Sequence, residues 1–364
     1  MTQRPAARGR ARDLGLPVGV LEPGPLNAIT DVAGVRVGQA TVWRDDDVVA
    51  RTGATAIWPH DGNPFRERVY AATSVFNGYG ILTGDIVLHE WGLLGAPVVL
   101  CDTANVGVAY DACVRYMSGR DPSVGTDDVL MPVVAECDDG FLNDNRAVTL
   151  RAQDVVAALD SATSGPVEEG VVGAGTGTQL FDFKGGIGTA SRIVRIGSRT
   201  FTIGVLLNTN YGTRAQLQIG GRRLGRQLTD DMPTQHREGS CIAVVATDIP
   251  LHPAQLRRLA RRVDIGLGRT GSVGNDGSGE IFLAFSTAQR IPREAADGIL
   301  PIEVMVEGQF WTHGSPFDLV FDAVAEASEE AALNALCQAD SVQGRNGNRL
   351  AGFPTEHALR LVNS

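Results

Sequence analysis

Residues 237–245 read REGSCIAVV, where a polar approach and a Gly-Ser pair lead directly into an apolar run. The run from Cys241 to Ala246 is compact and apolar, which predicts a buried strand. Gly239 and Ser240 lie where this strand begins. Two interpretations are open. The pair is an ordinary junction between a loop and a strand, or the chain is cut before Ser240, which then becomes a new N-terminus.

The second interpretation makes a specific chemical statement. A serine hydroxyl is a poor nucleophile until a base removes its proton, and a free α-amine, with a pKa of about 7.7–8.0, can be that base near neutral pH. Cleavage between Gly239 and Ser240 would create such an amine beside the hydroxyl. A glycine before the cut leaves room for the attack and tolerates a strained peptide. Taken alone, the stretch still favours the ordinary junction.

The rest of the chain predicts a mixed α/β fold with an exposed linker at residues 220–239, directly before Ser240. Apolar runs predict strands, and apolar residues at helical spacing predict helices. A helix over residues 253–267 would carry four arginines on a solvated face, namely Arg257, Arg258, Arg261 and Arg262. The expected strands are at 24–27, 29–38, 52–58, 96–101, 201–207, 241–246 and 281–285. The expected helices are at 83–94, 154–159, 253–267 and 323–339, and 271–279 is an expected loop.

Composition excludes several classes of function. A formal charge of −10 disfavours nucleic-acid binding, which depends on clustered Lys and Arg. No segment approaches the roughly 20 apolar residues of a membrane span and no signal-peptide pattern follows Met1, so we expect a cytoplasmic protein without a membrane partner. Five widely spaced cysteines predict reduced, buried thiols rather than disulfides or a zinc site. Phosphate-binding, zinc-protease and serine-hydrolase-elbow motifs do not occur, and the glycines at 173, 175 and 177 match a dinucleotide loop only loosely.

Three further groups could support a serine nucleophile, although each also has a structural explanation. Ser278 and Glu280 would project to one side of an extended backbone, so the carboxylate could hold a hydroxyl near the nucleophile; Asp276-Gly277 equally predicts a turn. Asn210, in a polar stretch after an apolar run, could donate to an oxyanion or simply form a turn. Glu136, the first of four carboxylates in residues 136–144, could bind a substrate ammonium group or solvate a loop.

Ordered blocks along nearly the whole chain resemble the DmpA family of self-processing aminopeptidases, which includes the β-peptidyl aminopeptidases. They include GPLNAITDVAGVRVG at 24–38, VFNGYGILTG at 75–84, DGFLND at 139–144, FKGGIGTASR at 183–192, NYGTRAQLQIGG at 210–221, GSCIAVVATDIPL at 239–251 and GSGEIFLAFST at 277–287.

The resemblance implies a four-layer αββα sandwich of the N-terminal-nucleophile (Ntn) hydrolase type, shared with ornithine acetyltransferases. Residues 1–364 would form a single structural domain that cuts itself between Gly239 and Ser240 into an α chain, 1–239, and a β chain, 240–364, which stay associated. Ser240 would be the nucleophile, Ser278 and Glu280 its supporting pair, and Asn210 an oxyanion donor, while Glu136 would bind the substrate amine. Processed units would form a homotetramer, and neither metal nor cofactor is implied.

The expected reaction releases an N-terminal L-, β- or D-amino acyl group from small peptides, amides or esters. One departure from the family pattern is Asp138, at a position where the family commonly has an aromatic residue, so a tyrosine contribution to the oxyanion site is not expected from it. Two alternatives are an amidase of non-peptide oligoamides and an acyl transferase resembling ornithine acetyltransferase. A third is a non-enzymatic protein that keeps the fold and is never processed.

Overall fold

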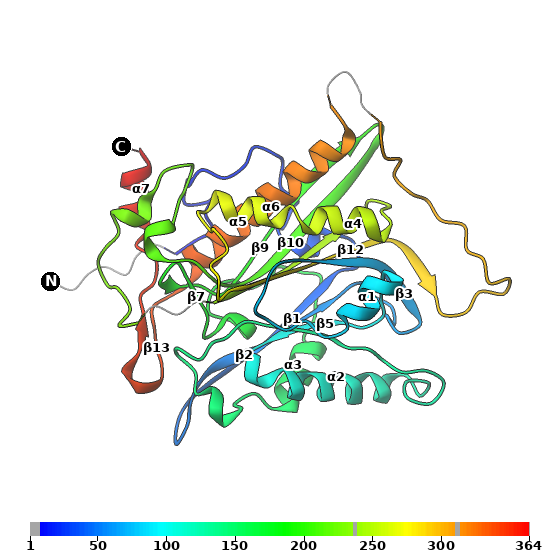
Figure 1. The fold of residues 1–364 in the computed structure, drawn as a ribbon, viewed down its shortest axis with the longest axis horizontal. Helices are drawn as coiled ribbons and strands as arrows, with labels where there is room; N and C mark the ends of the chain where they lie inside the picture. The colour runs from blue at the N-terminus through cyan, green and yellow to red at the C-terminus, as the bar shows by residue number, and fades with distance from the viewer. Residues whose placement is uncertain (1–7, 236–238, 310–313, 364) are drawn as a thin grey trace.

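The computed structural model describes residues 8–235, 239–309 and 314–363 and shows four layers (Figure 1). Two β-sheets lie face to face in the middle, and helices cover the outer face of each. One apolar cluster lies between the two sheets. A second lies between the larger sheet and its helices, and a third lies between the smaller sheet and its helices. The predicted αββα sandwich is confirmed.

The larger sheet has six strands in the order β4-β3-β12-β11-β10-β9. Its central strands are buried along most of their length, as their apolar runs predict. β11 runs parallel to β12 and antiparallel to β10. The strands are β3 (Glu67–Gly78), β4 (Leu93–Leu94), β9 (Ile187–Ile196), β10 (Arg199–Asn210), β11 (Ser240–Thr247) and β12 (Gly279–Pro292).

The smaller sheet has the order β1-β2-β5-β6, with β5 and β6 parallel. Its strands are β1 (Arg36–Asp45), β2 (Val49–Trp58), β5 (Val98–Cys101) and β6 (Val133–Glu136). Ile57 and Leu100 from this sheet pack in one cluster with Val244 and Leu283 from the larger sheet. Two short hairpins complete the sheet structure: β7 (Gln179–Leu180) with β8 (Phe183–Lys184), and β13 (Val342–Gln343) with β14 (Arg349–Leu350).

Helices α4 (Pro253–Ala260), α5 (Val263–Arg269) and α6 (Pro316–Gln338) cover the larger sheet, and α2 (Val106–Arg120) and α3 (Ala152–Asp160) cover the smaller one. Two further helices are α1 (Asp85–Trp91) and α7 (Thr355–Asn363). Long α6 begins at the N-cap Ser315, whose hydroxyl accepts a hydrogen bond from the backbone N–H of Phe317. Among the described residues, none of the helices is both long and apolar enough to cross a membrane.

Most predicted elements lie where the sequence places them, with three corrections. The helix expected at 83–94 ends at Trp91 because Gly92 adopts a left-handed conformation, and residues 93–94 form β4. The single helix expected at 253–267 is two helices, since α4 packs on β3 and β12 whereas α5 packs on α6 through Gly266, which has no room for a side chain. The segments 24–27 and 29–38 are not both strands: 24–27 is a turn in which the N–H of Asn27 donates to the Gly24 carbonyl, and a short helical turn at Ile29–Asp31 precedes β1, which starts at Arg36.

The arginine face of α4 and α5 is also less solvated than expected. Arg261 is exposed, but Arg258 and Arg262 are half-buried against the ring of Phe321, and Arg258 forms an ion pair with Glu307. Long arginine stems cover apolar surface while their charged ends reach solvent or a partner.

The predicted linker is mostly exposed, as expected, although Leu224 and Leu228 anchor it in the core and residues 236–238 lie outside the described part of the chain. All five cysteines are buried and free, which confirms the prediction of unpaired thiols.

Candidate active site

The three central strands of the larger sheet bring the predicted nucleophile and its neighbours together. Ser240 is the first residue of β11 and pairs across the ladder with Asn210, the last residue of β10. On the other side, the parallel register pairs Cys241 with Glu280 near the start of β12. Ser240 is only 5% exposed. The sheet therefore fixes the backbone positions of all three predicted residues from both sides.

Ser278 and Glu280 form the predicted side-chain pair. The Ser278 hydroxyl donates to Oε1 of Glu280 at 2.5 Å, and both residues are buried. The segment before them is a turn, in which Ser278 N–H donates to the carbonyl of Asn275, so the turn and the pair exist together. Burial raises the pKa of Glu280, and burial together with the nearby charge of Glu280 raises the pKa of Asp264 on α5 to about 7.

The Asn210 amide is held at both ends by backbone groups. Its Oδ1 accepts from the N–H of Gln179 at 3.0 Å, and its Nδ2 donates to the carbonyl of Asp138 at 2.8 Å. This arrangement points the N–H₂ end toward the backbone of Asp138, and the same nitrogen lies close to Gly239, the residue before Ser240. A side-chain amide held in this way can donate to a developing oxyanion without reorganising.

Gly239 lies directly against Asn210. A Cβ atom built at position 239 would be 2.7 Å from Asn210 Nδ2 and closer still to the Asn210 carbonyl oxygen. No side chain fits there, so glycine is the residue that lets the peptide before Ser240 approach the amide.

Glu136 ends β6 in the smaller sheet and faces the same cavity as Ser240. Its Oε1 accepts from the N–H of Ile81 at 3.0 Å, and its Oε2 accepts from the Thr103 hydroxyl. Burial raises the pKa of Glu136, and these two hydrogen bonds act in the opposite direction. The cavity has a volume of about 620 Å³ and is lined by Gly78, Tyr79, Gly80, Ile81, Thr103, Ala104, Glu136, Asp138, Asn145, Gly239, Ser240 and Gly277. A pocket of this size suits a small ligand.

Asp138, the residue at which the sequence departs from the family pattern of an aromatic side chain, also lines the cavity. Its Oδ1 accepts from Asn145 Nδ2 at 2.6 Å, and Asn145 also donates to Asp102. Behind it, burial raises the pKa values of Asp102 and Asp139, that of Asp139 most strongly. The wall around Glu136 is therefore acidic and rich in amide donors.

Several residues of this site carry no signal in the sequence. Thr103 orients Glu136, and Gln179 orients Asn210 through its backbone N–H, a group that every residue except proline has. Among the described ranges no group of three or more His, Cys, Asp or Glu side chains could hold a metal ion. The cavity is lined by the residue that carries the candidate hydroxyl, Ser240, and by the carboxylate of Glu136, which could bind an ammonium group. The Asn210 amide and the Ser278–Glu280 pair lie beside Ser240 in the sheet and are not part of the cavity lining.

Comparisons with known proteins agree with this site. Residues 27–350 match the model of peptidase family S58. The β-peptidyl aminopeptidase BapA of Sphingosinicella microcystinivorans is 38% identical over 97% of this chain and 91% of its own length. Among solved structures, the L-aminopeptidase D-Ala-esterase/amidase of Ochrobactrum anthropi is 42% identical with a TM-score of 0.90, covering 97% of this chain and 98% of its own. A Burkholderia β-aminopeptidase is 38% identical with a TM-score of 0.90, covering 98% and 99%.

The fold is a variant of the Ntn-hydrolase fold, the description given to the Ochrobactrum enzyme, and the class of protein is an aminopeptidase. The chain belongs to peptidase family S58, as the sequence blocks predict.

Proposed function

We propose that this aminopeptidase is made as a precursor that cuts itself between Gly239 and Ser240 and then uses Ser240 as its nucleophile. The observation that carries the proposal is that Glu136, Gly239 and Ser240 line one cavity, while Asn210 pairs with Ser240 across the strand ladder and its amide lies against Gly239. In the uncut chain, Ser240 has no free amine. After the cut, its amine and hydroxyl belong to the same residue, which satisfies the requirement for an activated serine.

In the proposed reaction, Ser240 Oγ attacks the carbonyl carbon of the first residue of the substrate. Asn210 Nδ2 and a backbone N–H stabilise the oxyanion, the amine product leaves, and water hydrolyses the acyl-enzyme. Glu136 binds the free ammonium group of the substrate. The proton of Ser240 is taken either by its own amine or by the Ser278–Glu280 pair, which the 2.5 Å hydrogen bond holds ready.

The substrates we propose are small peptides, amides or esters with a free N-terminal L-, β- or D-amino acyl group. Support comes from the relatives, one named for β-peptidyl substrates and one for L-amino and D-Ala substrates. A cavity of about 620 Å³ with an acidic wall accommodates a short, amine-bearing acyl group better than a long peptide.

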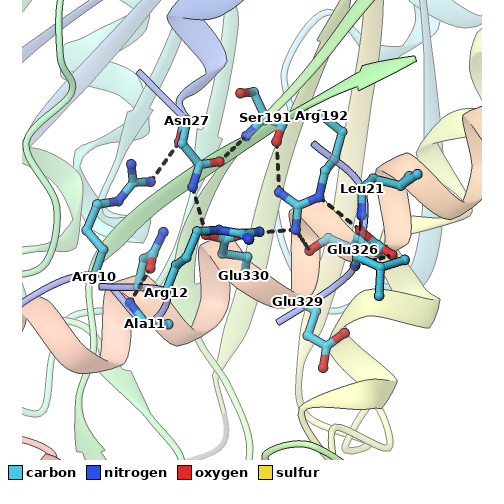
Figure 2. A network of polar contacts seen from close by, with 12 residues as sticks. Arg10, Ala11, Arg12, Leu21, Asn27, Ser191, Arg192, Glu326, Glu329 and Glu330 are labelled. Carbon is cyan, nitrogen blue, oxygen red and sulfur yellow. Dashed lines mark hydrogen bonds and ion pairs between the residues drawn. The ribbon is translucent and has the colours of Figure 1, made fainter. Parts of the chain in front are cut away.

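Two buried contact regions would hold the pieces together after the cut. Arg192 on β9 donates to Glu326 at 3.0 Å and to Glu330 at 2.7 Å, both on α6 (Figure 2). Arg12 and Asn27 also donate to Glu330, at 2.8 and 2.7 Å. All three donors belong to residues 1–239 and both acceptors to residues 240–364. The antiparallel pairing of β10 with β11 crosses the cut as well.

The decisive experiment compares the wild type with Ser240→Ala. Intact mass should show two wild-type fragments that join at 239/240, and N-terminal sequencing should find Ser240, whereas the variant should stay whole and inactive. Turnover of p-nitroanilides of L-Ala, β-Ala and D-Ala, with N-acetylated controls, then defines the acyl group. An active wild-type enzyme that stays whole would refute the proposal, and equal turnover of the acetylated compounds would remove Glu136 from its role.

We also expect a homotetramer of processed units and a cytoplasmic location. The exposed side chains of Val75, Phe76, Tyr79, Ile86 and Trp91 offer apolar surface for self-association, and five free cysteines suit a reducing compartment. Light scattering of the purified enzyme and fractionation of the producing cells test these two expectations.

A further inference from the structure

Lys184 is a fully buried cation next to the proposed site. Its Nζ donates to the carbonyl oxygens of Gly175, Thr178 and Gly185 at 2.8, 2.7 and 2.7 Å. An ammonium group has three N–H donors, so all are used. Within the part of the chain that the structure describes, no carboxylate forms an ion pair with it. Burial lowers the pKa of Lys184 to about 7, against the opposing charge of Asp139.

The three carbonyl groups lie on both sides of the β7–β8 hairpin. Gly175 and Thr178 precede β7, and Gly185 follows β8. Lys184 therefore ties the two ends of the hairpin to one atom. This segment is the glycine-dense stretch of the sequence, and Gly177 and Gly185 have no space for a Cβ atom because backbone atoms lie against them.

The hairpin is in direct contact with the oxyanion donor. The residue after Thr178 is Gln179, whose N–H donates to Asn210 Oδ1 at 3.0 Å. The next residues attach the hairpin to the end of β10, since Phe181 N–H donates to the carbonyl of Tyr211 at 2.9 Å. The Gln179 N–H holds Oδ1 as the acceptor and the Asp138 carbonyl holds one N–H of Nδ2, which leaves the second N–H of Nδ2 to donate in the site.

We propose that Lys184 is a positioning residue for catalysis, which clamps the β7–β8 hairpin so that the Gln179 N–H holds Asn210 in the orientation that stabilises the oxyanion. The proposal rests on the assignment of Asn210 under the proposed function. A buried charge without a carboxylate is costly, and an apolar side chain of similar volume often stabilises a fold better. Packing alone therefore does not explain why a lysine occupies position 184, whereas a role in orienting the Asn210 amide does.

The test uses Lys184→Met, which keeps the length of the side chain and removes the donors, and Lys184→Gln, a milder variant with two donors. The matched control is Arg192→Met, which also removes a fully buried cation but touches neither the hairpin nor Asn210. The readouts are kcat and KM per processed chain, the rate of precursor cleavage, thermal stability, and affinity for an amino-acid aldehyde with a free amine, which forms a tetrahedral adduct on the serine.

We expect Lys184→Met to lower kcat and aldehyde affinity at least about tenfold and to leave KM within about threefold. Lys184→Gln should fall between this variant and the wild type, and precursor cleavage should slow in the same order. Arg192→Met should lower stability at least as much, with kcat within about threefold. Asn210→Ala should cost about 10²–10³-fold in kcat, and Lys184→Met added to it should cost less than about threefold more, because both changes remove the same interaction.

Three results would overturn the inference: normal kcat in Lys184→Met, a loss that multiplies in full with that of Asn210→Ala, or an equal loss of kcat in Arg192→Met. The assignment of Asn210 is tested separately. If Asn210→Ala alone has normal kcat, the oxyanion role in the proposed function is wrong, whereas a damaged Asn210→Ala beside a normal Lys184→Met contradicts only the inference about Lys184.

Discussion

Replacing Gly239 with alanine should slow maturation without damaging the mature enzyme. A Cβ atom at position 239 would lie 2.7 Å from Asn210 Nδ2 and nearer to the Asn210 carbonyl oxygen, whereas non-bonded carbon and polar atoms normally stay about 3.5 Å apart. Relief of both overlaps moves the peptide before Ser240 by on the order of 1 Å. A misplacement of about 1 Å can cost about 10²-fold in rate, so we expect precursor cleavage to slow by about that factor.

Cell-free synthesis with a radioactive pulse measures this rate directly. Samples quenched in detergent at successive times separate the whole chain from the fragments 1–239 and 240–364, and the slope of their conversion gives the rate. Long incubation should still yield processed Gly239→Ala. Its turnover per processed chain should be within about threefold of wild type, because the cut leaves residue 239 on one piece and the nucleophile on the other.

Gly107→Ala is the matched control. A Cβ at Gly107 in α2 meets nothing within 4 Å, and alanine is a better helix former than glycine by about 0.5–1 kcal/mol, so cleavage should be normal and stability slightly higher. Cleavage of Gly239→Ala at the wild-type rate would refute the reasoning, since the contact with Asn210 would then have no part in holding the scissile peptide.

Three further predictions concern charged groups. Burial raises the pKa values of Glu136 and Glu280, so the acidic limb of a kcat/KM profile should lie above pH 4.5. Glu136→Gln should raise KM at least about tenfold and leave precursor cleavage unchanged. Slowed precursor cleavage in this variant would contradict a role for Glu136 in substrate binding alone. Burial alone would raise the pKa of Glu330, but Arg12 and Arg192 lower this pKa overall. Glu330→Gln should therefore destabilise the protein by about 3–5 kcal/mol in urea unfolding at neutral pH. This difference in stability should shrink as the pH falls through the pKa that Glu330 has in the folded protein. Because the pKa of Asp264 is raised from 3.8 to about 7, the wild type should lose stability as the pH rises between these values. In the same urea assay, Asp264→Asn should be more stable than the wild type by about 1–2 kcal/mol at pH 8 and no more stable at pH 3.

Sequence patterns predicted the elements of this fold better than their relations. The apolar run after Ser240 predicts β11 because a buried strand needs apolar side chains on both faces. The sequence around Ser240 does not indicate that β11 pairs with β10 at Asn210 on one side and runs parallel to β12 on the other, because the register depends on which strands are neighbours. The break between α4 and α5 has the same origin. At Gly266, α5 packs against α6, and the apolar periodicity of the sequence does not indicate that α5 packs on a different element from α4.

The candidate site shows the same division. Ser240, Ser278, Glu280, Asn210 and Glu136 could be selected from the sequence because their side chains have a chemistry that matches a reaction and because the blocks around them resemble a family. Hydrogen bonds from backbone groups, such as the N–H groups of Gln179 and Ile81, leave no trace in residue type. The glycine-dense stretch indicated a close approach, and the structure shows that backbone atoms of other segments lie against it, such as the Arg51 carbonyl oxygen at Gly177 and the Ala331 carbonyl oxygen at Gly188.

In the proposed function, the contact between Gly239 and Asn210 would let one site perform both self-cleavage and substrate cleavage. In the precursor, the peptide before Ser240 occupies the space beside the Asn210 amide, which is where a substrate carbonyl must lie for the same amide to stabilise its oxyanion. The proposed precursor would therefore be its own first substrate, and its cleavage would free the cavity for the next one. Residue 239 lies within the chain and has no ammonium group, so Glu136 can contribute only to the second reaction. The oxyanion donor is shared by both reactions, whereas selection for a free amine belongs to the mature enzyme.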